Sequence, residues 1–259
     1  MTTHTSVYQA AALYDLAFSY RDIAAEARFV RELYRRRRGR AAQSFLEVAA
    51  GPARHAIDMR AAGLAVLALD LAPEMATYAV EKAKARGLTL DYLVADMTTF
   101  EAPRTFDLAA CMLCSTSYLL TPEAVLAHLR SIRAALAPDG MYFLELTHPS
   151  ELAGERKSQS SWKMSDAGGE LSITWGGDLA KSINGVWHAD VELRYSPLDG
   201  SPPVQLHDAA DQRVFTQLEL ARFAEQSGFA IEASFGAFDE QIKVEDSRAH
   251  RWLVALRRA

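Results

Sequence analysis

Residues 44–53, together with residues 64–70, constrain the fold more than any other part of this 259-residue chain. The apolar run Phe-Leu-Glu-Val is typical of a buried strand, and it leads into the small residues Ala-Ala-Gly-Pro-Ala at positions 49–53. Such a turn lets the backbone come close to a ligand, because no large side chain intervenes. A second apolar run ends in a carboxylate, Asp70, one strand–helix–strand length after Glu47. The spacing predicts the first unit of a doubly wound α/β sheet.

Strands and helices continue to alternate after this unit, which favours a parallel sheet with right-handed crossovers. We expect strands over 44–49, 64–70, 88–95, 106–112 and 141–147, with helices over 53–62, 73–86 and 121–136. A helix ending at Gly228 and strands over 229–235 and 252–256 follow near the end of the chain. Two helices, over 5–20 and 22–38, precede the sheet, with Asp22 as an N-cap. The fold class predicted is an α/β, Rossmann-like sheet of seven strands.

Residues 148–213 break this alternation. Apolar and polar residues alternate with period two over 171–175 and 187–195, which is typical of strands with one apolar face. An insertion after the fifth strand lies over the carboxyl ends of the strands, where ligands bind in this architecture. We therefore divide the chain into an N-terminal helical cap (1–40), an α/β domain (41–147 and 214–259) and a β-rich lid (148–213).

Composition and charge narrow the class of protein. The chain is 49% hydrophobic and 24% charged, with a net charge of −5, which argues against a broad nucleic-acid surface. No apolar run approaches the ~20 residues that a membrane span needs, and residues 1–6 do not resemble a signal peptide. Only two cysteines occur, which suits a cytoplasmic location. We expect neither a nucleic-acid nor a membrane partner.

Two motifs are discounted. Cys111-x-x-Cys114 resembles half of a zinc or redox site, but it ends a buried strand and no second cysteine pair occurs, so we expect no metal. The four consecutive arginines at 35–38 resemble a nucleic-acid-binding patch. They end a helix, however, where positive charges are stabilised by the negative end of the helix dipole, and no aromatic residues lie between them, so we expect no nucleic-acid binding there.

The turn at residues 49–54 separates two classes of nucleotide-binding protein. Dinucleotide-binding enzymes need G-x-G-x-x-G, and here Arg54 occupies the last position, where it is too large for close packing of helix against strand. The segment resembles instead the acidic-x-G-x-G-x-G turn of class I S-adenosylmethionine (SAM) methyltransferases, with Glu47 as the acid and Ala49, Gly51 and Ala53 at the glycine positions. Segments 70–75, 95–97 and 136–140 add three further motifs in the order that this family has.

The resemblance covers about 45–147 and 214–259, and it extends to small-molecule enzymes such as the glycine and amino-sugar N-methyltransferases. It implies SAM as the cofactor. It also implies a role for each of several residues: Ala49 and Gly51 in the turn, Asp70 on the ribose, Leu71 and Met75 against the adenine, Asp96 and the Met97 amide at the adenine edge, and Met112 beside the sulfonium. In the glycine N-methyltransferase group, an N-terminal helix supplies a tyrosine, with an arginine seven residues later. Tyr14 and Arg21 match this spacing. The resemblance then implies that Tyr14 lies near the reacting atoms and that Arg21 pairs with the methionine carboxylate.

The sequence indicates less clearly which residues would bind the methyl acceptor. His148 directly follows the fifth strand and is a candidate general base for a hydroxyl acceptor, or else a structural histidine. Tyr118, Trp162, Trp175 and His188 are candidate substrate contacts, although Trp175 and Trp187 lie on apolar strand faces, which favours a place in the core for both. Residues 148–213 carry ten acidic and six basic side chains, which mildly favours a neutral or cationic acceptor.

These observations favour methyl transfer to a nitrogen or oxygen atom of a small molecule, plausibly a natural product or an amino-acid-derived metabolite. The main alternative is a SAM-binding protein of the same fold that does not transfer methyl, such as a cyclase or a regulator. A nicotinamide-dependent oxidoreductase is disfavoured by the missing glycine pattern. The sequence predicts no oligomeric state.

Overall fold

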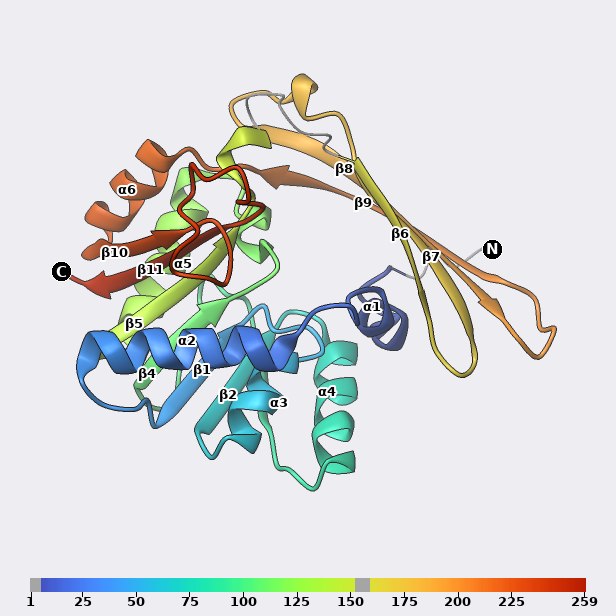
Figure 1. Ribbon diagram of the computed structural model, residues 1–259, viewed down its shortest axis with the longest axis horizontal. Helices are drawn as coiled ribbons and strands as arrows, with labels where there is room; N and C mark the ends of the chain where they lie inside the picture. The colour runs from blue at the N-terminus through green and yellow to red at the C-terminus, as the bar shows by residue number, and fades with distance from the viewer. Residues whose placement is uncertain (1–5, 152–158) are drawn as a thin grey trace.

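The computed structural model describes residues 6–151 and 159–259, and in it the chain builds two β-sheets (Figure 1). The larger sheet has seven strands in the order β10-β11-β5-β4-β1-β2-β3. The smaller has four, in the order β6-β7-β8-β9. The predicted Rossmann-like sheet of seven strands and the β-rich insertion are therefore both confirmed.

Strand direction in the larger sheet fixes where a site can form. Neighbouring strands are parallel from β5 through β4, β1 and β2 to β3, and antiparallel where β11 joins β5 and β10. The carboxyl ends of β1, β2, β4 and β5 therefore meet at one edge. The strands are β1 (Ser44–Val48), β2 (Ala65–Asp70), β3 (Asp91–Val94), β4 (Phe106–Cys111), β5 (Leu136–Leu146), β10 (Phe229–Phe235) and β11 (Trp252–Arg258).

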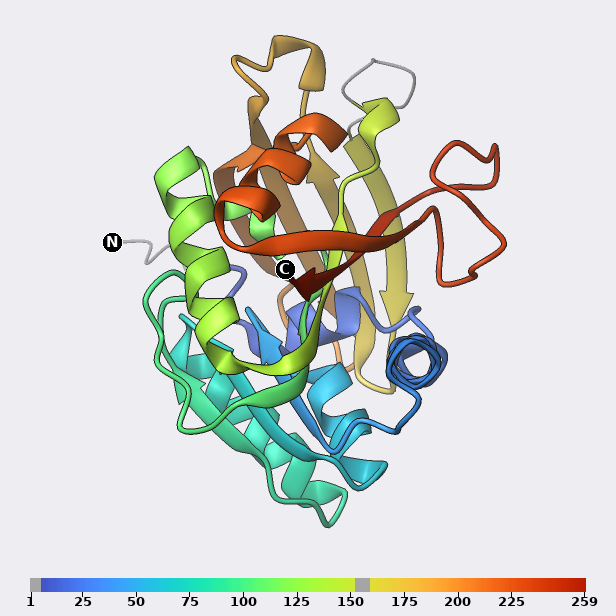
Figure 2. The ribbon, with the colours of Figure 1, turned by 90° about the vertical axis from the view of Figure 1, so that its left-hand side faces the viewer.

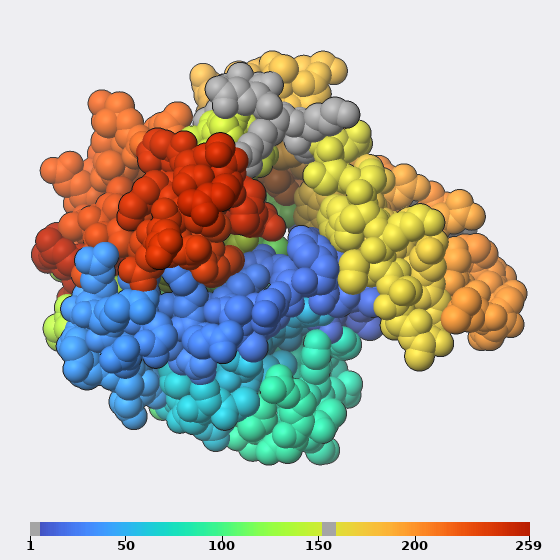
Figure 3. Space-filling view, viewed as in Figure 1, coloured from blue at the N-terminus to red at the C-terminus, as the bar shows by residue number. Residues whose placement is uncertain are grey.

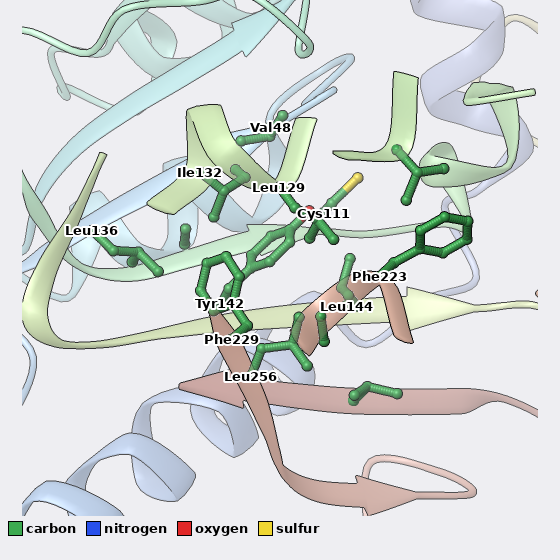
Figure 4. Packing of buried hydrophobic residues seen from close by; sticks show 14 of the residues in the cluster. Val48, Cys111, Leu129, Ile132, Leu136, Tyr142, Leu144, Phe223, Phe229 and Leu256 are labelled. Carbon is green, nitrogen blue, oxygen red and sulfur yellow. The ribbon is translucent and has the colours of Figure 1, made fainter. Parts of the chain in front are cut away.

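Helices cover both faces of this sheet (Figure 2). They are α1 (Ala11–Ala17), α2 (Ile23–Arg38), α3 (Arg54–Ala61), α4 (Pro73–Ala85), α5 (Pro122–Ala135) and α6 (Gln217–Gln226). On the α5–α6 face, Ile132 and Phe223 pack against Tyr142 and Leu144 of β5 (Figure 4). On the other face, Leu33 of α2 and Ile57 of α3 belong to a second apolar cluster. The sheet thus lies between two apolar layers, which leaves its strand ends as the place for a ligand.

The smaller sheet packs its inner face on the N-terminal segment. It consists of β6 (Gln159–Ser165), β7 (Gly169–Gly176), β8 (Val186–Pro197) and β9 (Val204–Arg213), all antiparallel. Buried and exposed residues alternate along β8, as period two requires. Leu171, Ile173 and Leu193 on its inner face form a cluster with Val7 and Phe18. Residues 7–18 are therefore held between the two sheets.

Three features differ from the sequence-based expectation. The first predicted helix, 5–20, is helical only from Ala11 to Ala17, and its residue 5 lies outside the described residues. Residues 6–9 turn because the Asp208 carboxylate accepts the Ser6 hydroxyl (2.6 Å) and the Val7 N–H (3.3 Å). Strands β6 and β9 were not predicted, because each is mainly polar and exposed at an edge of the smaller sheet.

In the part of the chain that the structure describes, no helix is long and apolar enough to cross a membrane.

Candidate functional site

A cavity of about 1060 Å³ lies between the carboxyl ends of the larger sheet, helix α1 and the smaller sheet. The space-filling view shows the surface hollowed where the N-terminal segment, the lid strands and the loop before β11 meet (Figure 3). Sites for drug-sized ligands measure roughly 300–1,000 Å³, so the cavity has room for a nucleoside cofactor and a second small molecule. Its walls include the predicted residues Tyr14, Ala49, Gly51, Asp70, Leu71, Met75, Asp96, Met97, Tyr118, His148, Trp162 and Trp175.

The turn after β1 has an unusual backbone. Ala49, Gly51 and Ala53 all adopt the left-handed region, with φ of 51°, 52° and 52°. A left-handed conformation costs an alanine about 1–2 kcal/mol, so this backbone path lowers the stability of the fold. Such strain is common at functional sites. A Cβ on Gly51 would lie 3.8 Å from the Tyr14 ring, so the ring covers the turn. The two alanines thus follow the same alternating path as the glycine between them.

Asp70 connects the end of β2 to this turn. Its Oδ2 accepts the Gly51 N–H (2.8 Å) and its Oδ1 accepts the Ala72 N–H (3.0 Å). Burial raises the pKa of the Asp70 carboxyl above its usual range, while the N–H groups of Ala72 and Gly51 oppose the rise. Each oxygen keeps a further lone pair, and the side chain lines the cavity. The carboxylate is therefore fixed in place and able to accept both hydroxyls of a ribose.

Beyond Asp70, the cavity is lined by residues of α4 and of the segments after β2 and β3. Leu71 lines the cavity and is 71% exposed, while Met75 lines it from α4 and is almost fully buried. Asp96 follows β3, and its Oδ1 accepts both the N–H and the hydroxyl of Thr98 (2.7 Å each), which lower the pKa of its carboxyl. Asp96 therefore fixes its own turn through Oδ1, and both Asp96 and Met97 line the cavity.

Arg21 does not lie in the cavity, contrary to the role implied by the family resemblance. Its guanidinium is bound by two carboxylates, Glu26 (2.9 and 2.6 Å) and Glu145 (3.2 and 2.8 Å). Burial alone lowers the pKa of Arg21, but Glu145 and Glu26 raise it overall. With both edges of the fork occupied, Arg21 is not free to pair with a methionine carboxylate, and among the described residues Arg251 is the arginine that lines the cavity.

Met112 also lies elsewhere than expected. It is 4% exposed and packs in the apolar cluster with Ala110 and Phe143, outside the cavity wall. The next two residues, Leu113 and Cys114, line the cavity instead, both left-handed at φ 53° and 56°. The Leu113 N–H donates to the buried Glu145 carboxylate (2.9 Å), which holds this strained turn. The sequence carried one signal of it, a glutamate near the end of the apolar run 141–146.

His148 lines the cavity, but both its ring nitrogens are engaged within the protein. Nε2 lies 2.8 Å from the Val244 carbonyl oxygen, which can only accept, so Nε2 carries the proton. Nδ1 then accepts from the Ser150 hydroxyl (2.7 Å) and the Ser150 N–H (3.2 Å). The only basic nitrogen is thus occupied, so the structure argues against the predicted general base and for the structural alternative.

Replacing His148 with glutamine is accordingly expected to lower turnover by less than about tenfold, whereas loss of a general base costs roughly 10²–10⁴. The rate should be measured from pH 6 to 9 with saturating SAM, beside the affinity for SAM. Ser150→Ala is the matched control, because it removes the hydroxyl bound to Nδ1 while keeping the ring and the backbone N–H. A hundredfold loss in His148→Gln with unchanged SAM affinity would restore the histidine as a base.

Aromatic side chains form the acceptor side of the cavity. Trp162 is fixed by its Nε1–H donating to the Ala17 carbonyl oxygen (2.8 Å), and Trp175 packs on Tyr14 with ring centroids 6.4 Å apart. The hydroxyl of Tyr118 hydrogen-bonds that of Tyr8, and Gln212 donates to it (3.2 Å). Tyr8, Trp187, Gln212 and His250 line the cavity too and were not predicted as site residues, because they come from segments far apart in the chain.

His188 is not part of this wall. It lies on the exposed face of β8, where Nδ1 pairs with Asp211 at 2.9 Å. The alternation of β8 explains this, because its neighbours Trp187 and Ala189 point inward. The acidic side chains of β8, Asp190 and Glu192, share that outer face and cannot select an acceptor.

Comparison with known proteins agrees with the geometry. Residues 45–140 match the family described as "Methyltransferase domain". None of the curated proteins matches the chain. Among solved structures, Streptomyces venezuelae DesVI is 23% identical with a TM-score of 0.80, over 96% of this chain and 98% of that one.

Two further structures are similar over nearly their whole length. A SAM-dependent methyltransferase from Clostridium acetobutylicum is 17% identical with a TM-score of 0.79, over 96% of this chain and 97% of that one. An amino pentose methyltransferase from Micromonospora echinaspora, solved with SAM bound, is 21% identical with a TM-score of 0.72, over 100% and 99% of the two chains. These likenesses include the smaller sheet and show a shared fold.

Proposed function

We propose that the chain is a class I SAM-dependent methyltransferase, and that it transfers the methyl group of SAM to a nitrogen or oxygen atom of a small molecule. One observation carries the proposal. A single cavity joins a nucleoside-sized half, built on the left-handed turn and Asp70, to an aromatic half lined by Trp162, Trp175 and Tyr118. Two ligands can thus meet over the carboxyl ends of β1 and β4.

The residues present fit the cofactor. Ala49 and Gly51 allow close approach of the backbone, Asp70 accepts the ribose hydroxyls, and Leu71 and Met75 pack on the adenine, with Asp96 and Met97 at its edge. Bound SAM supplies an electrophilic methyl group on a sulfonium. The protein then positions an acceptor and excludes water. Tyr14 covers the turn, and burial raises the pKa of its phenol, so its hydroxyl stays protonated near the reacting atoms.

A nitrogen acceptor fits this site better than a hydroxyl. A neutral amine needs no general base, and the basic nitrogen of His148 is already occupied. Similar solved structures are described as a sugar N-methyltransferase and a glycopeptide N-methyltransferase. The aromatic half offers flat surfaces for a ring, which supports an acceptor of the natural-product type. Because both cysteines are free, a cytoplasmic location remains our prediction.

Calorimetry should show that the protein binds SAM and S-adenosylhomocysteine and binds NAD far more weakly. The reason is the turn at 49–53, which lacks the glycines for a pyrophosphate, together with Asp70 and Asp96. Methyl transfer is then measured with labelled SAM on a panel of primary amines, secondary amines and alcohols. Tight SAM binding without transfer to any acceptor would favour the alternative, a SAM-binding protein that does not methylate. Tighter binding of NAD than of SAM contradicts the proposal.

A further inference from the structure

Charge is distributed unevenly over the cavity wall. Three acids, Asp70, Glu74 and Asp96, lie on the cofactor side, after β2 and β3. Among the described residues of the wall, Arg251 is the only lysine or arginine. It directly precedes β11, and β11 is separated from β1 by β5 and β4. Arg251 therefore faces the acceptor side of the cavity.

The loop between β10 and β11 is built to hold Arg251 there. The Gly236 carbonyl oxygen accepts the N–H groups of both His250 and Arg251 (3.0 Å each), and the Gly236 N–H donates to the Ile242 carbonyl oxygen (2.7 Å). A Cβ at position 236 would collide with Ala249 and with the Lys243 backbone, so the loop can close only on glycine. The position of Arg251 is thus set by backbone hydrogen bonds.

A buried carboxylate orients its guanidinium. Nε of Arg251 lies 3.2 Å from Oε1 of Glu145, which is fully buried at the end of β5. The same carboxylate binds Arg21 and the Leu113 N–H, so one negative charge is shared by two guanidiniums. Arg21 has Glu26 as a second partner, whereas Arg251 has no other paired side chain among the described residues. Within the part of the chain that the structure describes, its positive charge is therefore only partly compensated, and no hydrogen bond engages its two terminal amino groups.

We propose that Arg251 binds an anionic group, a carboxylate or a phosphate, on the methyl acceptor. A guanidinium held through Nε presents its remaining edge as a planar fork, which matches both kinds of anion. The acceptor would then carry its ring or chain between the aromatic walls and its anionic group toward β11. This inference rests on the proposed function. It also replaces the expectation of a neutral or cationic acceptor, since Glu151 alone of the insertion's described acids lines the cavity.

The proposal is tested with protein saturated with S-adenosylhomocysteine. Phenyl phosphate, benzoate and neutral benzamide serve as probes, followed by the fluorescence of the cavity tryptophans. Both anionic probes, or one of them, should bind about tenfold or more tightly than benzamide. Arg251→Gln should remove that preference and leave benzamide binding unchanged. The stronger of the two anions identifies the class of acceptor group.

Two variants serve as controls. Arg248→Gln changes an exposed arginine of the same loop, paired with Asp246, and should keep the preference for anions. Arg251→Lys keeps a charge for Glu145 but loses the fork, and should fall between the wild type and Arg251→Gln. It also keeps the test valid if the glutamine variant folds poorly.

Two results would overturn the inference. One is equal binding of charged and neutral probes by the wild type. The other is that Arg251→Gln weakens binding of S-adenosylhomocysteine but not of 5′-methylthioadenosine, which lacks the carboxylate and would mark Arg251 as a cofactor ligand. SAM binding and methyl transfer by the wild type are measured separately. Their failure would count against the proposed function, whereas a missing anion preference beside intact transfer counts against this inference alone.

Discussion

SAM binding is expected to weaken by roughly 1.5–3 kcal/mol when Asp70 is replaced with alanine, because two charge-assisted hydrogen bonds are lost. The carboxylate is fixed by the N–H groups of Gly51 and Ala72, so it meets the cofactor without further ordering. Isothermal calorimetry on the wild type and the variant measures the difference directly. Asp70→Asn should lose less, because its single amide oxygen can still accept one hydrogen bond, although its NH2 group can accept neither a hydroxyl nor the second backbone N–H.

Asp91→Ala is the matched control for this experiment. Asp91 begins the neighbouring strand β3, is exposed, and does not line the cavity. Its variant should bind SAM as the wild type does. Urea unfolding of both variants shows whether the fold is kept. A SAM affinity of Asp70→Ala within twofold of the wild type would mean that Asp70 does not bind the ribose.

The cofactor side could be predicted from the sequence because its determinants are local. The turn at 49–53, Asp70 and Asp96 each follow a strand that an apolar run reveals, and parallel strands bring their carboxyl ends together. Sheet order and helix alternation follow from the same pattern. The left-handed path of Ala49 and Ala53 is the exception, because nothing in an alanine marks it.

The acceptor side could not be predicted in this way, because its determinants are distant in sequence. His148 is engaged by Val244, and Arg21 is bound by Glu145, each pair about a hundred residues apart. Arg251 has no local motif, and its role depends on a loop that closes on Gly236. The structure argues against the roles first assigned to His148 and Arg21 for this reason: a side chain's freedom to bind a ligand depends on what else it already binds.

Charged side chains of α2, α3 and β1 form a buried network, and breaking it is expected to destabilise the fold strongly. His55 of α3 lies between Glu47 (3.2 Å) and Glu26 (2.8 Å), and Glu26 in turn binds Arg21. His55 and Glu47 are 4% and 3% exposed. Removing one partner of a buried ion pair costs about 3–5 kcal/mol. His55→Ala is therefore expected to lower the free energy of unfolding by about that amount, as measured with urea at pH 7.

The same network predicts how stability changes with pH. Burial by itself lowers the pKa of His55, but the carboxylates of Glu26 and Glu47 outweigh it and raise the pKa to about 9. The folded state thus holds its proton more tightly than the unfolded chain, whose histidines titrate near 6.5. The stabilisation, on the order of 3 kcal/mol, is complete below about pH 6.5 and is lost as the pH rises through about 9. Urea unfolding from pH 6 to 10 should show this decline in the wild type and in His188→Gln, whose histidine is exposed, but not in His55→Gln. A parallel decline in His55→Gln would show that His55 is not the group responsible.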